Sequence, residues 1–196
     1  MLFTGRYMKK TIFVLIFSLI SSFCFCQKKL ISFSAGVISG VPVYSSETLK
    51  EINSTLTGGV RIICGTDVYI NLNPNEFTTF FAGLDLLSDF NNLTPYYSNH
   101  LSLDFPFGIK IYPKLAGLSF GLGYNLGFRT DYYNTEECGK YTEQAAWGNG
   151  FKFLVEYDFS HSGKRFLPAI GLYWKYMPRG NNTYDNQICA YINTNI

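Results

Sequence analysis

Two neighbouring stretches of the sequence, 100–111 and 118–128, alternate apolar and polar residues with a period of two. In the first stretch, Leu, Phe or Ile occupies every second position from Leu101 to Ile111. In the second, apolar residues alternate with glycine, serine and asparagine from Leu118 to Phe128. Successive side chains of a β-strand point to opposite sides, so this period indicates strands with one apolar and one polar face.

The length of these runs restricts the fold further. Each run is about 12 residues long, roughly twice the usual length of a strand in a globular protein. At about 3.3 Å per residue and a tilt near ~45°, such a strand spans the ~25–30 Å apolar layer of a membrane. The composition agrees, because 18 Phe, 15 Tyr and 18 Gly favour strands over helices. The runs therefore predict a transmembrane β-barrel.

The same alternation recurs along the chain and predicts eight strands. We expect them at about 30–41, 60–70, 77–87, 100–111, 118–128, 151–159, 166–176 and 188–196. The connections alternate between long and short, as in outer-membrane barrels with short periplasmic turns and longer external loops. The predicted fold is all-β, an eight-stranded antiparallel up-and-down transmembrane barrel within residues 27–196. The connection 42–58 has a pattern that allows one helical turn.

On every predicted strand, the charged residues lie on the face opposite the apolar row. A lysine or arginine on the lipid face costs about 2–4 kcal/mol at mid-depth. We therefore expect the apolar rows to face lipid and the charges to pair across a lumen that side chains can just fill. These candidate lumen residues are Arg61, Asp67, Asp85, Asp104, Lys110, Lys152, Glu156, Asp158 and Lys175.

Some residues depart from the simple alternation. Phe81, Leu87 and Leu154 fall on the polar face and are expected to point inward. Pro106 lies in mid-strand, where proline removes a ladder donor, and it predicts a bulge or local distortion. Aromatic residues near the strand ends are expected to form two girdles at the membrane interfaces. They are Tyr44, Tyr96, Tyr97, Tyr132, Tyr133, Trp147 and Tyr184 near the long loops, and Phe77, Tyr112, Phe159 and Phe166 near the short turns.

The N-terminus has the pattern of a secretory signal peptide. Two lysines precede an apolar run from Thr11 to Ile20, and polar residues follow at 27–29. The apolar run is shorter than a typical membrane-spanning helix. We predict a signal peptide at residues 1–26, cleaved after Cys26, and export to a bacterial outer membrane. An uncleaved anchor helix is the alternative.

Two further questions concern the start of the chain and its cysteines. Residues 1–7 precede Met8, which is a second candidate start, and a lipoprotein attached at Cys24 or Cys26 is a further alternative. Three cysteines follow the predicted cleavage site: Cys64, Cys138 and Cys189. An odd count without CxxC spacing favours neither a disulfide framework nor a zinc site. One disulfide and three free thiols both fit.

The sequence carries little sign of catalysis. A net charge of +2 without a Lys/Arg stripe argues against nucleic acid as a partner. Hydrolysis needs a nucleophile, a base and an orienting acid within reach of one another. His161 lies in a predicted turn, whereas His100 lies near a strand end with Ser98, Ser102 and Asp104 nearby. No common catalytic motif is present. We expect no enzymatic activity, no cofactor and no metal, and a hydrogen bond in the rim or lumen for His100; catalysis there is the alternative.

Taken together, residues 28–196 resemble small bacterial outer-membrane barrels of the OmpX, OmpW and OmpA-barrel type. The last strand resembles the C-terminal assembly signal of such barrels, although it ends in Ile196 instead of an aromatic residue. The resemblance implies insertion into outer-membrane lipid by the barrel-assembly machinery. It also implies surface-exposed loops, which serve adhesion or host interaction in some members, while others pass small hydrophobic compounds.

We accordingly expect a structural or surface-interaction role, adhesin-like, with loops 42–58 and 129–147 as the site of an external ligand. One alternative is a barrel that binds or passes a small hydrophobic molecule. Another is a soluble periplasmic carrier similar to a lipocalin, since the strands of such a barrel would alternate too.

Overall fold

The computed structural model describes residues 30–113, 117–136, 139–144, 147–159, 168–180 and 182–195. Its elements are β1 (Ile31–Tyr44), α2 (Glu47–Thr55), β2 (Val60–Leu72), β3 (Thr78–Leu93), β4 (Tyr96–Ile111), β5 (Leu118–Thr135), β6 (Gly139–Gln144), β7 (Gly148–Asp158), β8 (Pro168–Pro178) and β9 (Tyr184–Asn195). Several predictions concern residues outside the described ranges: the signal peptide at 1–26 with Cys24 and Cys26, and Cys138, His161, Phe166 and Ile196.

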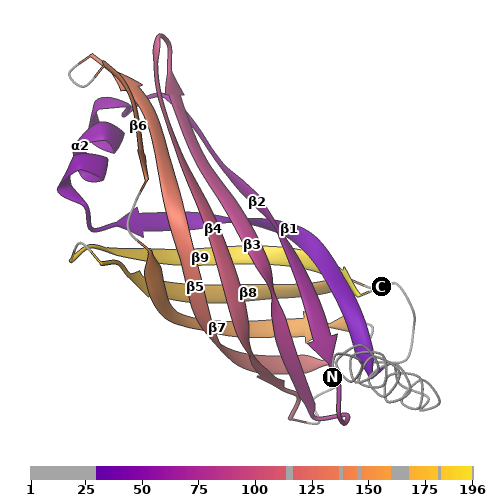
Figure 1. Ribbon diagram of the computed structural model, residues 1–196. Helices are drawn as coiled ribbons and strands as arrows, with labels where there is room; N and C mark the ends of the chain where they lie inside the picture. The colour runs from indigo at the N-terminus through magenta and orange to yellow at the C-terminus, as the bar shows by residue number, and fades with distance from the viewer. Residues whose placement is uncertain are drawn as a thin grey trace, which may run out of the picture.

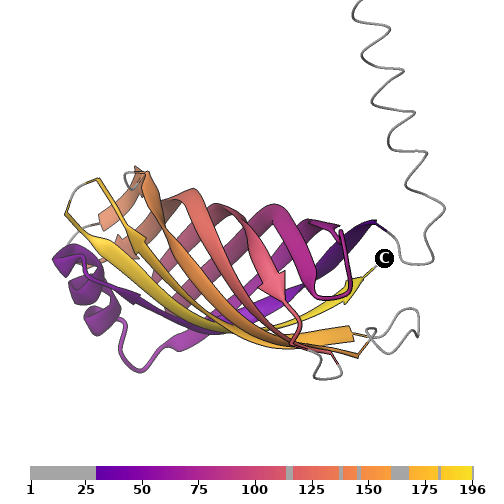
Figure 2. The ribbon, with the colours of Figure 1, turned by 90° about the horizontal axis from the view of Figure 1, so that it is seen from below.

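Eight of the strands form one closed antiparallel barrel (Figure 1, Figure 2). Each of β1 to β4 pairs with the strand that follows it, β5 pairs with β7, and β7, β8 and β9 pair in order. The pairing of β9 with β1 closes the ring. The remaining strand, β6, pairs with the last six residues of β5, from Thr130 to Thr135, and is not part of the ring. This confirms the predicted all-β, eight-stranded up-and-down barrel.

The two ends of the barrel differ. One end carries α2, the β3–β4 hairpin and β6, and we call it the helix end (Figure 1). The start of β1 and the end of β9 lie at the other end, which we call the terminus end. At the helix end several strands run farther than predicted. The prediction of a loop at 88–99 is wrong, because β3 continues to Leu93 and β4 begins at Tyr96.

The ladder between β3 and β4 is interrupted beside Pro106. Pairing runs as far as Ala82 with Phe107 and resumes in the same register at Asp85 with Asp104. Proline has no backbone N–H to donate to the neighbouring strand. The predicted local distortion is therefore an interruption of the ladder, without an inserted residue.

The outer face of the barrel is apolar except toward the helix end, where outward residues such as Asn92 and Asn134 are polar. Val37, Leu172 and Ile188, for example, are each about 60% exposed (63%, 60% and 62%). Within the described residues, no charged side chain belongs to the outward-facing set of the eight barrel strands. Two outward hydroxyls are satisfied by backbone carbonyls: Ser39 donates to Ile63 and Thr66 donates to Gly36, each at 2.7 Å. These two hydroxyls therefore need no water to satisfy them.

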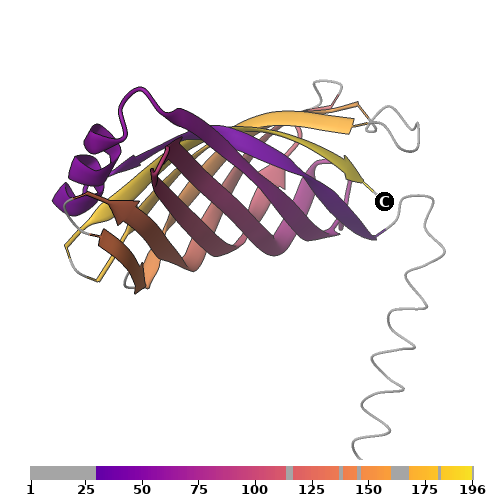
Figure 3. The same cartoon turned by 90° about the horizontal axis from the view of Figure 1, so that it is seen from above.

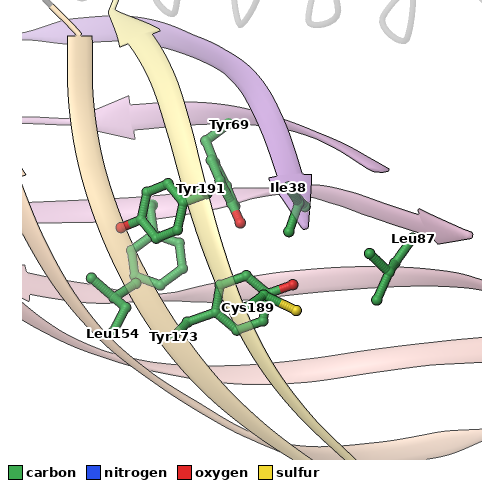
Figure 4. Close-up of a cluster of buried hydrophobic side chains, with 8 residues drawn as sticks. Ile38, Tyr69, Leu87, Leu154, Tyr173, Cys189 and Tyr191 are labelled. Carbon is green, nitrogen blue, oxygen red and sulfur yellow. The ribbon is translucent and has the colours of Figure 1, made fainter. Parts of the chain in front are cut away.

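The inner face holds a packed cluster of large side chains, including the predicted inward Phe81, Leu87 and Leu154 (Figure 4). Glycines at the paired positions of the neighbouring strands make room for them. A Cβ atom on Gly171 would lie 2.4 Å from the ring of Tyr191, and one on Gly121 would lie 2.7 Å from Leu154. Such distances are shorter than any van der Waals contact, so no residue larger than glycine fits at these two positions without a shift of the neighbouring side chain. The large side chains of the paired strands occupy that part of the lumen.

The helix α2 covers the mouth of the barrel at the helix end (Figure 3). The sequence pattern predicts a single turn here, but the helix has 9 residues. Its Leu49 and Ile52, together with Leu56, pack against Tyr44 and Tyr133. Among the described residues, no helix has the length and apolar character needed to cross a membrane.

The aromatic girdles are partly as predicted. Tyr132, Trp147, Tyr184, Phe77 and Phe159 are exposed at the barrel ends. The prediction is wrong for Tyr44 and Tyr133, which are 5% exposed and lie inward under α2, and for Tyr112, which is also buried. The two inward tyrosines occupy positions in phase with the lumen residues of their own strands.

Candidate functional site

The structure places the candidate lumen residues on the inner face, in three tiers along the barrel. Eight of them are buried, and Arg61, at the helix end, keeps 37% of its side chain exposed. A buried charge costs several kcal/mol unless it is paired and hydrogen-bonded. The pairing of each tier therefore decides whether it can be stable.

The tier at the terminus end is built around Glu156. Lys110 approaches both carboxylate oxygens of Glu156, at 2.7 and 2.9 Å, and Tyr191 donates a hydrogen bond to it at 2.8 Å. Tyr112, directly beyond β4, is buried nearby, and this burial raises the pKa of its phenol, with Glu156 and Asp158 adding to the effect. This tier joins β4, β7 and β9 across the lumen.

The middle tier is a row of aspartates opposite two lysines. Asp67, Asp85 and Asp104 are direct cross-strand partners on β2, β3 and β4, and each is 1% exposed. Lys152 lies 2.7 Å from Asp85, and Lys175 pairs with Asp104. Both ion pairs cross the lumen, because the lysines come from β7 and β8.

Two tyrosines surround the charge of Lys152. Its ammonium group donates to the hydroxyl of Tyr69 at 2.6 Å, and Tyr69 donates in turn to Asp85. The same ammonium group lies 4.0 Å from the ring centre of Tyr173. An ammonium group close to an aromatic ring gains further stabilisation when water is excluded. Lys152 is therefore the most connected charge of the lumen core.

At the helix end, Asp89 accepts two hydrogen bonds from Arg61, both 2.8 Å long, and one from the hydroxyl of Tyr44 at 3.0 Å. The ring of Tyr44 also lies 4.9 Å from the guanidinium of Arg129. Tyr44 thus connects the charged tier to the apolar residues beneath α2.

The rest of this tier is a chain of alternating charges. Arg129 donates to Asp131 at 2.8 and 3.1 Å and also to Asp185. Arg179 donates to the second oxygen of Asp185 at 2.6 Å. His100 lies 2.9 Å from Asp131. These ion pairs connect β4, β5 and β9 to the residue that follows β8. They close the barrel below α2.

His100 pairs with an aspartate other than the one that the sequence suggested. Its hydrogen-bond partner is Asp131 of β5, and the residue is 1% exposed below Tyr44, whose ring centre is 5.0 Å away. Asp104, which the sequence suggested as a neighbour, pairs with Lys175 instead. The described residues also contain no group of metal-binding side chains, and Cys64 and Cys189 are free thiols.

Five members of the helix-end tier were not predicted from the sequence: Asp89, Arg129, Asp131, Arg179 and Asp185. They lie in segments that were predicted to be loops. A signal was present, because Asp89 continues the inward phase of Asp85, and Arg129 and Asp131 continue that of Asn125.

The fold and the inward charges define a class of small eight-stranded β-barrel. Among solved structures, one similar fold is Ail, the attachment invasion locus protein of Yersinia pestis, in complex with the heparin analogue sucrose octasulfate; the TM-score is 0.57 at 6% identity, over 85% of this chain and 97% of that one. Neisserial surface protein A is 12% identical, with a TM-score of 0.49 over 84% of this chain and 96% of that one. No protein-family model and no curated protein matches the sequence. The likeness to Ail shows that this chain has the fold of a small outer-membrane barrel.

Proposed function

We propose that this chain is a bacterial outer-membrane barrel, exported by its signal peptide and inserted by the barrel-assembly machinery, which presents its helix end to partners outside the cell. The observation that carries the proposal is the distribution of side chains. The outer face is apolar and the ionic groups are inside. A closed barrel of this kind satisfies every backbone group without water, which is the condition for crossing a bilayer.

The same observation argues against a soluble lipocalin-like carrier. Such a carrier has its apolar side chains inside, around the ligand, and polar side chains in water. Here Phe33, Phe151 and Phe153 point outward and are 52%, 52% and 46% exposed. An apolar surface of this extent on a soluble monomer would promote aggregation.

The packing of the lumen argues against a conduit for small hydrophobic molecules. Phe81 and Leu154, the predicted inward apolar residues, fill space opposite glycines. Ion pairs cross the lumen at all three tiers, from Lys110–Glu156 at one end to the arginines below α2 at the other. A solute would have to separate these pairs in order to pass.

With the lumen closed, the helix end is the surface left for a partner. The exposed face of α2 carries Lys50 paired with Glu47 at 2.9 Å, and β6 carries exposed Lys140 and Glu143. Ail was crystallised with a heparin analogue, but the mixed charge on α2 and β6 suits a protein surface better than a sulfated glycan, because complementary charges of both signs select partners.

Three measurements test the proposal: membrane fractionation of the producing cells, gel mobility of the purified protein, and conductance in planar bilayers. We expect the protein in outer-membrane fractions, and unheated samples to migrate differently from boiled samples on a denaturing gel. In planar bilayers we expect no conductance at the level of an open pore. Recovery in the soluble fraction, or stable pore-sized conductance, would contradict the proposal.

A further inference from the structure

The three aspartates of the middle tier lie side by side on neighbouring strands. Asp67 of β2 pairs with Asp85 of β3, and Asp85 pairs with Asp104 of β4. Each of these residues is 1% exposed. Carboxylates that share a site repel one another, so the row is stable only if each negative charge is compensated or removed.

The strands across the lumen supply two lysines for these three carboxylates. Lys152 and Lys175 are themselves cross-strand partners, so they form one pair of cations facing the row. Lys152 pairs with Asp85 and Lys175 pairs with Asp104. In the part of the chain that the structure describes, Asp67 belongs to no ion pair.

The other cations of the lumen, buried or partly exposed, have partners elsewhere. Lys110 makes both of its contacts to Glu156, and Arg61 makes both of its contacts to Asp89. The remaining lumen arginines belong to the helix-end tier, where their partners are Asp131 and Asp185. One negative charge in the middle of the lumen would therefore lack a cation.

A second observation concerns hydrogen bonds around Asp67. Its Oδ1 atom is buried and has no partner within the described residues. Gly36 of β1 pairs with Asp67 on one side and with Asn193 of β9 on the other. Asn193 therefore continues the row of aspartates, two strands from Asp67. Asn193 is 2% exposed, and its Nδ2 atom is also buried without a partner in that set. An isolated buried carboxylate neutralises itself by taking up a proton, because the charged form is too costly.

We propose that Asp67 binds one proton, so that the folded barrel carries a neutral carboxyl group in the middle of its lumen at neutral pH. The row then holds two negative charges, which Lys152 and Lys175 compensate. A neutral carboxyl group both donates and accepts hydrogen bonds. It can therefore hydrogen-bond to a donor or to an acceptor in the lumen, whereas the charged form can only accept.

Infrared spectroscopy tests the proposal directly. The barrel, refolded in phosphatidylcholine vesicles at neutral pH, should show the C=O stretch of a protonated carboxyl group above the amide band. The band should move when the carboxyl carbons of aspartate are labelled with ¹³C, and it should be absent from Asp67→Asn. Glu47→Gln, on the exposed face of α2, is the matched control and should leave the band unchanged.

The pH dependence of unfolding is the second measurement. Unfolding at neutral pH releases the bound proton to water, so raising the pH favours the unfolded state. Relative to Asp67→Asn, the unfolding constant of the wild type should rise about tenfold per pH unit while the native site keeps its proton. Should Asp67→Asn fail to fold, the ¹³C-labelled wild type still decides whether a protonated aspartate is present.

A wild-type spectrum without the band would overturn the proposal. So would a band that Asp67→Asn retains, or stability that depends on Na⁺ or K⁺ concentration in place of pH, since a metal cation would then compensate Asp67. None of these results would affect the outer-membrane fractionation that tests the proposed function.

Discussion

Replacing Lys152 by methionine is expected to lower the free energy of unfolding by about 3–5 kcal/mol, because it leaves a buried carboxylate without its cation. Lys152 is 2% exposed and contacts Asp85, Tyr69 and Tyr173. Methionine has a similar length and keeps the packing, so the change isolates the charge. Urea unfolding from phospholipid vesicles, followed by tryptophan fluorescence, provides the measurement.

Two variants separate this effect from a general one. Lys50→Met removes a lysine whose side chain is 54% exposed beside Glu47, and exposed pairs contribute about 0–1 kcal/mol. The double variant Lys152→Met with Asp85→Leu replaces both members of the buried pair and should recover most of the loss, since apolar replacements of buried ion pairs are often neutral. A loss of stability for Lys152→Met no larger than that for Lys50→Met would show that Asp85 does not need its buried cation.

Replacing Leu172 by arginine is expected to cost about 2–4 kcal/mol, the penalty for arginine on the lipid face near mid-depth. Leu172 lies in the middle of β8 and is 60% exposed. On a soluble protein, such an exposed position would accept arginine with little change in stability. The result therefore distinguishes a membrane-facing surface from a water-facing one.

The matched control for Leu172→Arg lies at the helix end of the barrel. Tyr184 begins β9 and is 41% exposed, and arginine near the membrane interface costs about 0–1 kcal/mol. Equal stabilities of Leu172→Arg and Tyr184→Arg, both close to the wild type, would contradict a bilayer around β8.

The sequence predicts the barrel well wherever one face meets lipid. In β4, from Leu101 to Ile111, and in β7, polar and apolar residues alternate because the two faces have different surroundings. The phase of Asp104 and Lys152 follows from that difference. Alternation fails where β3, β4 and β5 rise toward the helix end, because outward residues there, such as Asn92 and Asn134, are polar as well.

Loss of alternation explains why the helix-end tier was missed. A strand with polar residues on both faces has no period of two, so the segment 88–99 has the composition of a loop. The sequence also could not predict which lumen lysine pairs with which carboxylate. Which lysine meets Asp85 depends on the register and stagger of β2, β3, β7 and β8 around the ring, and no local pattern encodes them.

The position of Trp174 relative to lipid tests the central claim most directly. This residue lies on the outer face of β8, is 43% exposed, and stacks on Phe153 with ring centres 5.4 Å apart. In a Trp147→Phe variant it is the remaining tryptophan, since the chain has two. Refolded in vesicles of phospholipids with brominated acyl chains, its fluorescence should be strongly quenched, while iodide in the water should have little effect. Quenching by iodide without quenching by the brominated chains would show that the apolar face does not contact the membrane.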